Sequence, residues 1–446
     1  MKKMFFITYA ARCLGVGKKG EASNARKSLI GACIGIGISI VPLIVVLVLS
    51  NGMINGITTR MVELGSGHIR LLQRKVLASE NDGRHEKALK NNLLNKYKDN
   101  PYFKNAWVER QGTGLLIGKT GRSGGQIRAI EKKFFTENTG ASKLIQVLEG
   151  KLEFENNKTL FLGKKLAANL HLNVGDTCRI LTFKTGKKGT PIPKMSVFKV
   201  GAIVSSGYQD LDALWIFIPL EKGLQIFKGS NSLTSILVTV DDVFNDSLFE
   251  PFVYSLKNNY SNKFRIYTWK DLNQSQFMSF KTTKNILLFV MFLIILVAST
   301  NISSALVMLV LERTREIAIL KATGASSSNI TLAFLTAGVI TSLGGILVGL
   351  PLGILLALNI NSLFKITEKT INYLKYLIHT ASGKTSELLY VHILDPEYYL
   401  EHIPIKITLP EIFLIATGIL ILSILVSIIP SIRAGNEKPI DIMRKL

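Results

Sequence analysis

The chain has 446 residues, 47% of them hydrophobic, and its 54 basic and 31 acidic side chains give a formal net charge of +23. This hydrophobic share and the positive mean hydropathy exclude the usual composition of a soluble protein and favour an integral membrane protein. Of the three cysteines, only Cys178 falls in the region expected on the extracytoplasmic side. That region must therefore be held together by its own hydrophobic core and not by a disulfide.

Four runs contain no Asp, Glu, Lys or Arg, and each has at least the roughly 20 residues that a helix needs to cross a bilayer. They are Ser28–Thr59, Asn285–Leu311, Ala322–Phe364 and Ile412–Ile432. For any single run the alternative is a buried helix of a large soluble protein, but such helices rarely exceed about 20 residues without a charge. We predict transmembrane helices at 28–51, 285–311, 327–360 and 412–432.

The basic residues before the first run predict how the chain is oriented. Residues 1–27 hold seven Lys and Arg side chains against one Glu, which indicates a cytoplasmic N-terminal segment. A cleaved signal peptide is the alternative, but the apolar core Leu29–Leu49 is longer than the roughly 7–15 residues of such a segment. With four crossings, 312–326 and the tail 433–446 are cytoplasmic, whereas 52–284 and the loop 361–411 are extracytoplasmic.

The region 52–284 is predicted to be a large α+β domain between the first two membrane helices, with a central insertion near 130–225. Runs rich in β-branched residues predict strands at 68–72, 114–118, 178–183, 197–204, 214–220 and 235–240. Helical patterns occur near 88–97, 164–170 and 243–258. Much of the net positive charge lies in this region, where it either solubilises the surface or faces anionic membrane lipid or an acidic protein; outside the cytoplasm we expect no nucleic acid.

Small residues recur every four positions in two of the predicted membrane helices, a spacing that lets helices approach closely. They are Gly31, Gly35 and Ser39 in the first helix and Gly345, Gly349 and Gly353 in the third. The alternative is the ordinary tolerance of glycine in membrane helices. Tight helix packing explains two independent repeats better.

The segment KTGKKGTPIPK at 184–194 lies between two predicted strands. Its punctuating glycines and prolines predict a protruding hairpin loop. The residues of interest are Lys184, Lys187, Lys188, Pro191, Pro193 and Lys194. Spacing alone favours a flexible surface loop over a binding element.

No pattern in the chain predicts catalysis. GLLIGKT at 114–120 lacks the glycine spacing of a phosphate loop, and SGKT at 382–385 lacks the first glycine. The six histidines are dispersed without metal-ligand spacing, and no nucleophile elbow occurs. We expect no metal, no cofactor and no enzymatic activity in this chain, so any work that it does needs an external energy source.

The segment LERTREIAILKATGAS at 311–326 places five charges between two charge-free runs. On a helix, Glu312, Arg315, Glu316 and Ile319 share one face, while Arg313, Ile317, Leu320 and Gly324 form another stripe. A positive-inside anchor would need basic residues but not two glutamates. The mixture favours a helix that binds a cytoplasmic protein.

This segment resembles the loop between the second and third membrane helices of ATP-binding-cassette permeases of the lipoprotein-releasing LolC/LolE family, within the MacB/FtsX-like superfamily. VLSNGMINGITTRMVELGSGHIRL at 48–71, Trp269 and IIPSIRAGNEKPIDIMR at 428–444 resemble further landmarks of that family. The likeness covers nearly the whole chain. It implies a permease of the inner membrane that mechanically transmits the work of a separate, dimeric ATP-binding subunit and pairs with a second permease as a heterodimer or homodimer.

The resemblance also implies site residues and cargo. The coupling helix 312–326 would dock on the ATPase through residues that match the family motif: Glu312, Arg313, Arg315, Glu316, Ile317, Lys321, Gly324 and Ala325. The loop 184–194 corresponds to a hook that captures a periplasmic lipoprotein carrier, and the cargo would be lipoproteins lifted from the outer leaflet. Three alternatives stay open: an efflux permease, a cell-division permease that regulates cell-wall hydrolases, or a basic membrane-anchored binding protein without transport.

Overall fold

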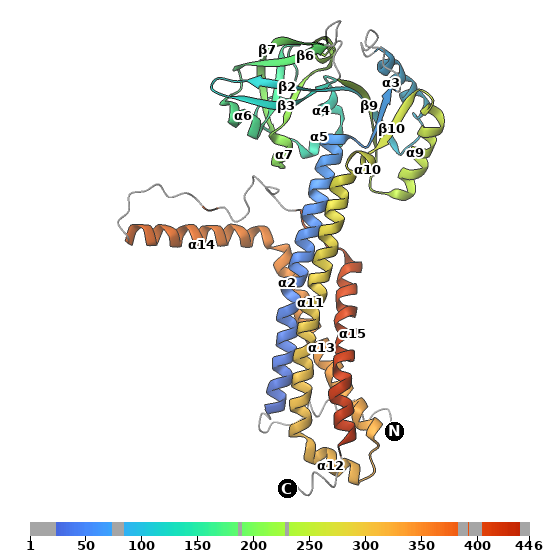
Figure 1. Cartoon of the computed structure of the whole chain (residues 1–446), viewed down its shortest axis with the longest axis vertical. Helices are drawn as coiled ribbons and strands as arrows, with labels where there is room; N and C mark the ends of the chain where they lie inside the picture. Colours follow the sequence, from blue (N-terminus) through green and yellow to red (C-terminus); the bar gives the residue numbers. More distant parts are fainter. Residues whose placement is uncertain are drawn as a thin grey trace. The chain divides into compact units, whose positions relative to one another are not determined.

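The computed structural model describes residues 24–73, 84–185, 190–227, 232–381, 391 and 404–437 (Figure 1). The chain forms two compact units. Unit 1 comprises Met1–Gly52, Lys281–Val391 and Pro404–Leu446, and unit 2 comprises Met53–Phe280 and His392–Ile403. The predicted fold class, four membrane helices with an α+β domain between the first two, is confirmed.

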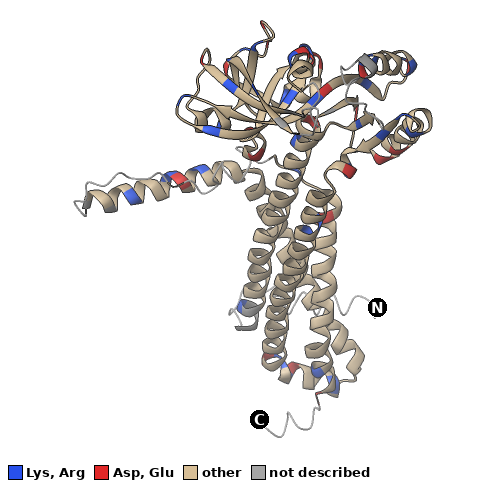
Figure 2. Ribbon diagram, turned by 45° about the horizontal axis from the view of Figure 1, so that its top comes forward, with Lys and Arg blue, Asp and Glu red and all other residues tan. Residues whose placement is uncertain are grey.

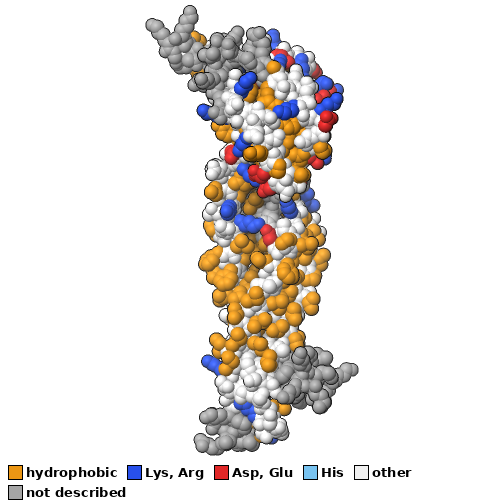
Figure 3. Space-filling model, turned by 90° about the vertical axis from the view of Figure 1, so that its right-hand side faces the viewer, with side chains coloured by type: hydrophobic (Ala, Val, Ile, Leu, Met, Phe, Trp, Pro, Cys, Tyr) orange, Lys and Arg blue, Asp and Glu red, His pale blue; other side chains and the backbone are white. Residues whose placement is uncertain are grey.

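Unit 1 is built on four helices that are long and apolar enough to cross a membrane. They are α2 (Asn24–Arg60), α11 (Gln274–Glu312), α13 (Ser327–Leu358) and α15 (Leu409–Asn436). Hydrophobic side chains cover the middle of these helices on the face drawn in Figure 3. With 37 and 39 residues, α2 and α11 are each about 55 Å long, well beyond the roughly 30 Å of a hydrocarbon core. The boundary between the units falls inside both helices.

Helices α2 and α13 meet through glycine. A Cβ atom at Gly349 would lie 2.8 Å from the carbonyl oxygen of Gly37, and one at Gly345 would lie 2.8 Å from Ile36 Cβ. Gly353 continues the row against Ile44. The contact thus leaves no room for side chains on α13, and the two backbones attract each other over a close van der Waals surface.

The repeat expected on α2 takes a smaller part in this contact. Nothing lies within 4 Å of the Cβ position of Gly31, and that of Gly35 lies 3.6 Å from Asn301 Nδ2 on α11. The Ser39 hydroxyl donates to the carbonyl of Gly35 at 2.9 Å. The glycine of α2 that meets α13 is Gly37. It lies two residues after Gly35 and is not a member of the repeat noted in the sequence.

A polar cluster joins three helices of unit 1 at one end of the charge-free stretch. The Glu411 carboxylate of α15 accepts hydrogen bonds from Asn51 Nδ2 of α2 and, at 2.5 Å, from the Thr408 hydroxyl. Lys284 Nζ of α11 lies 2.6 Å from the same carboxylate. An ion pair backed by two further hydrogen bonds holds α2, α11 and α15 together at this point.

Two further helices belong to unit 1. α12 (Thr314–Ala322) lies between α11 and α13, within the expected coupling segment. α14 (Ile360–Ala381) follows α13 after a break at Asn359. The segment 361–411, expected only as a loop, therefore begins with a 22-residue helix.

Unit 2 contains one mixed sheet of ten strands in the order β10-β1-β9-β2-β3-β8-β5-β7-β4, with β6 paired to β2 and β7. The strands are β1 (Ile69–Gln73), β2 (Phe103–Ile117), β3 (Arg122–Ile130), β4 (Gln146–Gly150), β5 (Thr159–Gly163), β6 (Thr177–Thr185), β7 (Pro191–Ser205), β8 (Trp215–Pro219), β9 (Leu233–Val240) and β10 (Phe264–Thr268). Two parallel pairings, β3 with β8 and β5 with β7, place segments from the predicted insertion inside the sheet.

Short helices cover this sheet. They are α3 (Arg84–Lys96), α4 (Phe134–Glu137), α5 (Thr139–Leu144), α6 (Lys164–Leu170), α7 (Gln209–Asp212), α8 (Leu220–Ile226), α9 (Asp246–Tyr260) and α10 (Trp269–Leu272), with a π-helical turn η1 (Met61–Ser66) at the end of α2. Every residue of β5 and β8 is buried, as their short apolar runs require. Lys and Arg occur on the helices, strands and loops of this unit (Figure 2).

The α2–α13 contact gives a first prediction. Gly349→Ala places a methyl group against the backbone of Gly37, so it should lower the stability of unit 1 by about 1–3 kcal/mol through overpacking. Thermal unfolding of the full chain in detergent measures the change. Gly418→Ala on α15 is the matched control, because its Cβ would meet nothing within 4 Å. Equal melting temperatures for the two variants would contradict the tight seam.

Candidate functional site

The predicted coupling segment is a short helix with one buried and one exposed face. In α12, Ile317 and Ala318 are fully buried in the core of unit 1. Arg315 and Glu316 are exposed, and Ile319 between them on the same face is 57% exposed. Glu312, the last residue of α11, and Thr323, the residue after α12, are exposed as well. The face combines both charges with an apolar centre, which is the composition of a protein-binding surface and not of a purely solvated one.

A glycine with positive φ defines the C-terminal end of α12. Gly324 has φ of +99°, and its N–H donates to Lys321 O at 3.0 Å while Ala325 N–H donates to Leu320 O at 2.9 Å. These two bonds form a Schellman motif, in which glycine at the left-handed position ends the helix. Ser326 then caps α13 by accepting from Asn329 N–H. The sequence KATGAS thus contains both the C-terminal end of α12 and the N-cap of α13.

Other expected coupling residues hold the segment in place. Lys321 Nζ donates to the carbonyl oxygen of Glu437, at the end of α15, at 2.6 Å. Arg313 is half-buried and pairs with Glu316 one turn along the helix. Ile317 packs inward, and Gly324 and Ala325 form the helix stop. The exposed face is therefore narrower than the set expected from the sequence: Glu312, Arg315 and Glu316, with Ile319 in addition.

The expected hook lies at the end of a long β-hairpin. β6 and β7 pair from Thr177↔Lys199 to Thr185↔Pro191, and this ladder includes Lys184 opposite Ile192. Lys187 and Lys188 fall outside the described residues. Pro193 is exposed, and Lys194 Nζ donates to the Gln225 carbonyl at 3.2 Å. Large apolar side chains on the hairpin are about half exposed: Phe183, Ile192, Met195 and Val197.

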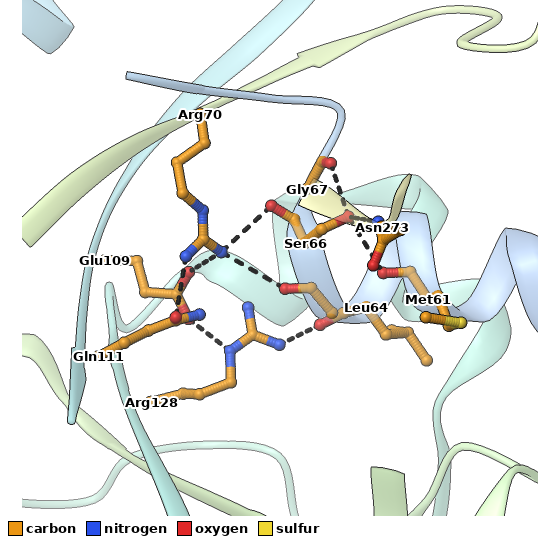
Figure 4. A network of polar contacts seen from close by, with 10 residues as sticks. Met61, Leu64, Ser66, Gly67, Arg70, Glu109, Gln111, Arg128 and Asn273 are labelled. Carbon is orange, nitrogen blue, oxygen red and sulfur yellow. Dashed lines mark hydrogen bonds and ion pairs between the residues drawn. The ribbon is translucent and has the colours of Figure 1, made fainter. Parts of the chain in front are cut away.

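A buried charge cluster in unit 2 was not foreseen from the sequence (Figure 4). Glu109 on β2 is completely buried and forms ion pairs with Arg128 on β3 and, at 3.4 Å, with Arg70 on β1. Gln111 accepts from Arg70 at 2.8 Å and donates to Glu109 at 3.2 Å. Glu109 and Arg128 lie on the consecutive strands β2 and β3, whereas Arg70 comes from β1, so only the folded sheet brings all three together.

The cluster caps the end of the first membrane helix. Arg128 Nη1 donates to the carbonyl oxygen of Leu64, and Arg70 Nη2 donates to that of Ser66 at 3.1 Å. These carbonyls belong to the π-helical turn η1, where Gly67 N–H bonds to Val62 O at 3.0 Å. The last carbonyls of a helix lack partners within the helix, and cations there also complement the helix dipole. The two arginines thus bind the end of the α2–η1 helix to the sheet.

Electrostatics keep this cluster ionised. Burial raises the pKa of Glu109, but the nearby Arg128 and Arg70 charges and the hydrogen bonds from Arg128 and Gln111 outweigh it, so this pKa lies below its ordinary value. Burial lowers the pKa of Arg70, and Glu109 opposes that shift. A buried ion triad is costly to break because any remaining charge would be unpaired in a low dielectric.

The sequence feature that could have indicated a buried charge cluster is WVER at 107–110. Two charges inside a strand that is otherwise buried need partners. The sequence could indicate that need but not the partners. Among the residues that the structure describes, no group of three or more His, Cys, Asp or Glu side chains could hold a metal ion.

Four long apolar helices, an inserted mixed-sheet domain and a short connecting helix with an exposed charged face define an integral membrane protein with a large extramembrane domain. Two family models match it: the MacB-like periplasmic core domain at residues 29–248 and the FtsX-like permease C-terminal domain at 288–439. The chain therefore combines a MacB-like periplasmic core domain with an FtsX-like permease C-terminal domain.

Named relatives lie in the same family. The chain is 24% identical to the "Lipoprotein-releasing system transmembrane protein LolE" of Haemophilus influenzae over 99% of each chain. It is 25% identical to the corresponding LolC of Xylella fastidiosa over 64% of each chain. Among solved structures, the periplasmic region of MacB from Actinobacillus actinomycetemcomitans matches 48% of this chain and 94% of its own length, with 16% identity and a TM-score of 0.30.

The buried cluster gives a second prediction. Glu109→Gln leaves two arginines without their carboxylate, so it should destabilise the cluster by about 3–5 kcal/mol. Hydrogen exchange at η1 and β2 of the full chain measures this loss. Glu149→Gln, at an exposed position on β4, is the control and should leave exchange at both elements unchanged.

The same cluster predicts a pH dependence. A carboxyl whose folded pKa is depressed stabilises the fold above its unfolded pKa of about 4.3, and this contribution is lost as pH falls through the lower folded pKa. Protection of η1 in the parent should therefore decrease on acidification below about pH 4. A Glu109→Gln variant with the same acid-induced loss would show that Glu109 is not its source.

Proposed function

We propose that this chain is the permease subunit of an ATP-driven transporter that extracts lipoproteins from the outer leaflet of the inner membrane and passes them to a periplasmic carrier. The names of the LolE and LolC relatives support this cargo. The chain contributes no catalytic residue, and the energy comes from a separate cytoplasmic ATP-binding subunit. The observation that carries the proposal is the exposed face of α12, with Ile319 at its centre.

The α12 face suits docking on another subunit. An exposed isoleucine beside Arg315 and Glu316 gives an apolar contact surrounded by charges of both signs, so it can combine desolvation with charge complementarity. The opposite side of α12 is fixed by Ile317 in the core and by the Lys321 bond to Glu437. A push on the exposed face therefore moves unit 1 as a body, because the short helix cannot shift alone.

Motion then has a continuous path through the chain. α13 begins two residues after the α12 stop and contacts α2 through Gly349. α2 continues without a break into η1, whose carbonyls are held by Arg70 and Arg128. We infer that ATP-driven movement of α12 reaches the sheet of unit 2 by this route. The two termini are cytoplasmic and the sheet domain periplasmic in this arrangement.

The energetic demand explains why ATP is needed. Exposing a buried acyl chain to water costs about 0.8 kcal/mol per CH₂, so a multi-acyl anchor cannot leave the bilayer spontaneously at a useful rate. A dimeric ATPase needs two coupling helices, one for each of its subunits. We therefore infer that the chain pairs with a second permease, either another copy or a related partner.

Exchanging the charges on α12 tests the docking proposal. In Arg315→Glu with Glu316→Lys, the net charge is unchanged and the one-turn pair of Glu316 with Arg313 is lost, which is worth about 0.2–0.5 kcal/mol to the helix. Binding of the cognate ATP-binding subunit to the full chain should nevertheless weaken about tenfold or more, and lipoprotein release should fall with it.

The matched control exchanges two exposed charges in unit 2, Lys151→Glu with Glu153→Lys, and should keep both activities. If the α12 variant still binds the ATP-binding subunit and releases lipoproteins fully, the docking assignment is overturned. Normal ATPase binding with no lipoprotein release in the parent chain would instead retain the coupling role and overturn the cargo.

The hairpin β6–β7 supports the proposed carrier capture through its apolar side chains. Phe183 and Met195 are each more than half exposed, although they lie on a well-paired ladder. A carrier of acylated proteins must itself present apolar surface, so an apolar hairpin fits it better than the lysines alone. We propose that this surface, more than Lys184 or Lys194, makes the contact.

Phe183→Asp tests the hairpin. It should weaken binding of the periplasmic carrier to the full complex about tenfold, as measured by surface-immobilised titration, because a charge replaces an apolar contact. Val174→Asp introduces the same charge at an exposed apolar position elsewhere in unit 2 and serves as the control. Equal carrier affinities for both variants would contradict the proposal that the hairpin binds the carrier.

A further inference from the structure

Helix α14 has an amphipathic pattern that the membrane-crossing helices lack. With about 100° per residue, its larger apolar side chains fall within one arc of less than half the circumference. These are Leu363, Phe364, Ile366, Ile371, Leu374 and Leu377. Lys365 and Lys369 lie on the opposite side.

The apolar arc is exposed, which is the reverse of a helix that packs on a protein core. Ile366 is 61% exposed, Leu374 52% and Leu377 46%. The polar side, by contrast, is joined to the returning chain: the Asn372 side-chain amide donates to the carbonyl of Val391 and accepts from its N–H, at 3.0 and 2.9 Å. Among the described residues, Val391 thus contacts the polar side of α14, whereas the apolar side chains of the arc are exposed.

The position of α14 indicates what covers this arc. α14 follows α13 directly. The last turn of α13 exposes Leu355 and Leu358, as a membrane-crossing helix exposes apolar side chains to lipid. The helix therefore starts where the chain leaves the hydrocarbon. Its charges are mainly basic, with Lys365, Lys369 and Lys375 against Glu368 (Figure 2). Tyr373 and Tyr376, both more than half exposed, add the aromatic rings that concentrate at bilayer interfaces.

We propose that α14 lies in the membrane interface, with its apolar arc among the acyl chains and its lysines bound to anionic phospholipid headgroups. With four crossings, this is the leaflet on the same side as unit 2. Length and charge pattern match interfacial helices, which lie in the plane of the bilayer and do not span it. The helix then anchors the end of α13 to the leaflet surface. This assignment needs only the membrane spans, not the proposed transport cycle.

Site-directed spin labelling tests the position of α14 in the full chain. The three native cysteines are replaced by alanine, and a nitroxide is placed at I371C or K369C after reconstitution into phosphatidylcholine bilayers containing one quarter phosphatidylglycerol. We expect the label at 371 to collide with dissolved oxygen more than with a water-soluble nickel chelate, and the label at 369 to show the reverse. Equal nickel access at both positions, or protection of 371 from both reagents by a protein or a second copy, would overturn the proposal.

A second arm tests the headgroup charge. With the label at L374C, Lys365→Glu combined with Lys369→Glu should raise nickel access severalfold in the phosphatidylglycerol bilayers and change it little in pure phosphatidylcholine. Lys257→Glu with Lys263→Glu, at exposed positions in unit 2, is the matched control and should have no effect. A similar rise in both lipids, or with the control pair, would overturn the binding of anionic lipid.

Discussion

The rest of the structure depends on the close contact between α2 and α13. In lipid, the hydrophobic effect does not drive helices together, so contact must come from surfaces that fit at short range. Gly349 meets the Gly37 backbone with no side chain between them. This contact joins the helix that follows α12 to the helix that enters the sheet domain.

The second requirement is a rigid junction at the other end of α2. The last carbonyl groups of a helix have no partner within the helix and need donors from elsewhere. Arg70 and Arg128 supply those donors, and Glu109 keeps both guanidinium groups in place. The polar cluster of Asn51, Lys284 and Glu411 has a comparable role among the helices of unit 1. Both junctions use ion pairs with additional hydrogen bonds, which fix direction better than apolar contacts do.

Sequence reasoning found the features that depend on local composition. The four charge-free runs predicted the membrane helices because no other common structure tolerates such length, and α6 was predicted at its observed bounds because its pattern is local. Features that depend on how strands pair in the folded sheet were missed, including β3, β5 and the partners of Glu109. α14 was missed because its lysines broke the charge-free run, although its apolar spacing was helical. Gly324 remains a predicted docking residue, and the structure adds that its positive φ ends α12, which the sequence did not indicate.

The π-helical turn η1 limits how this family of chains can change in length. A π turn closes its ring with one more residue than an α turn, as the Gly67 to Val62 bond shows. Deleting that residue would restore α-helical geometry but turn the following carbonyls by about 100°, away from the arginines that bind them. Natural variants can therefore lengthen α2 in steps of about seven residues, or two turns, and keep the junction, whereas single insertions would need a compensating deletion in the same helix.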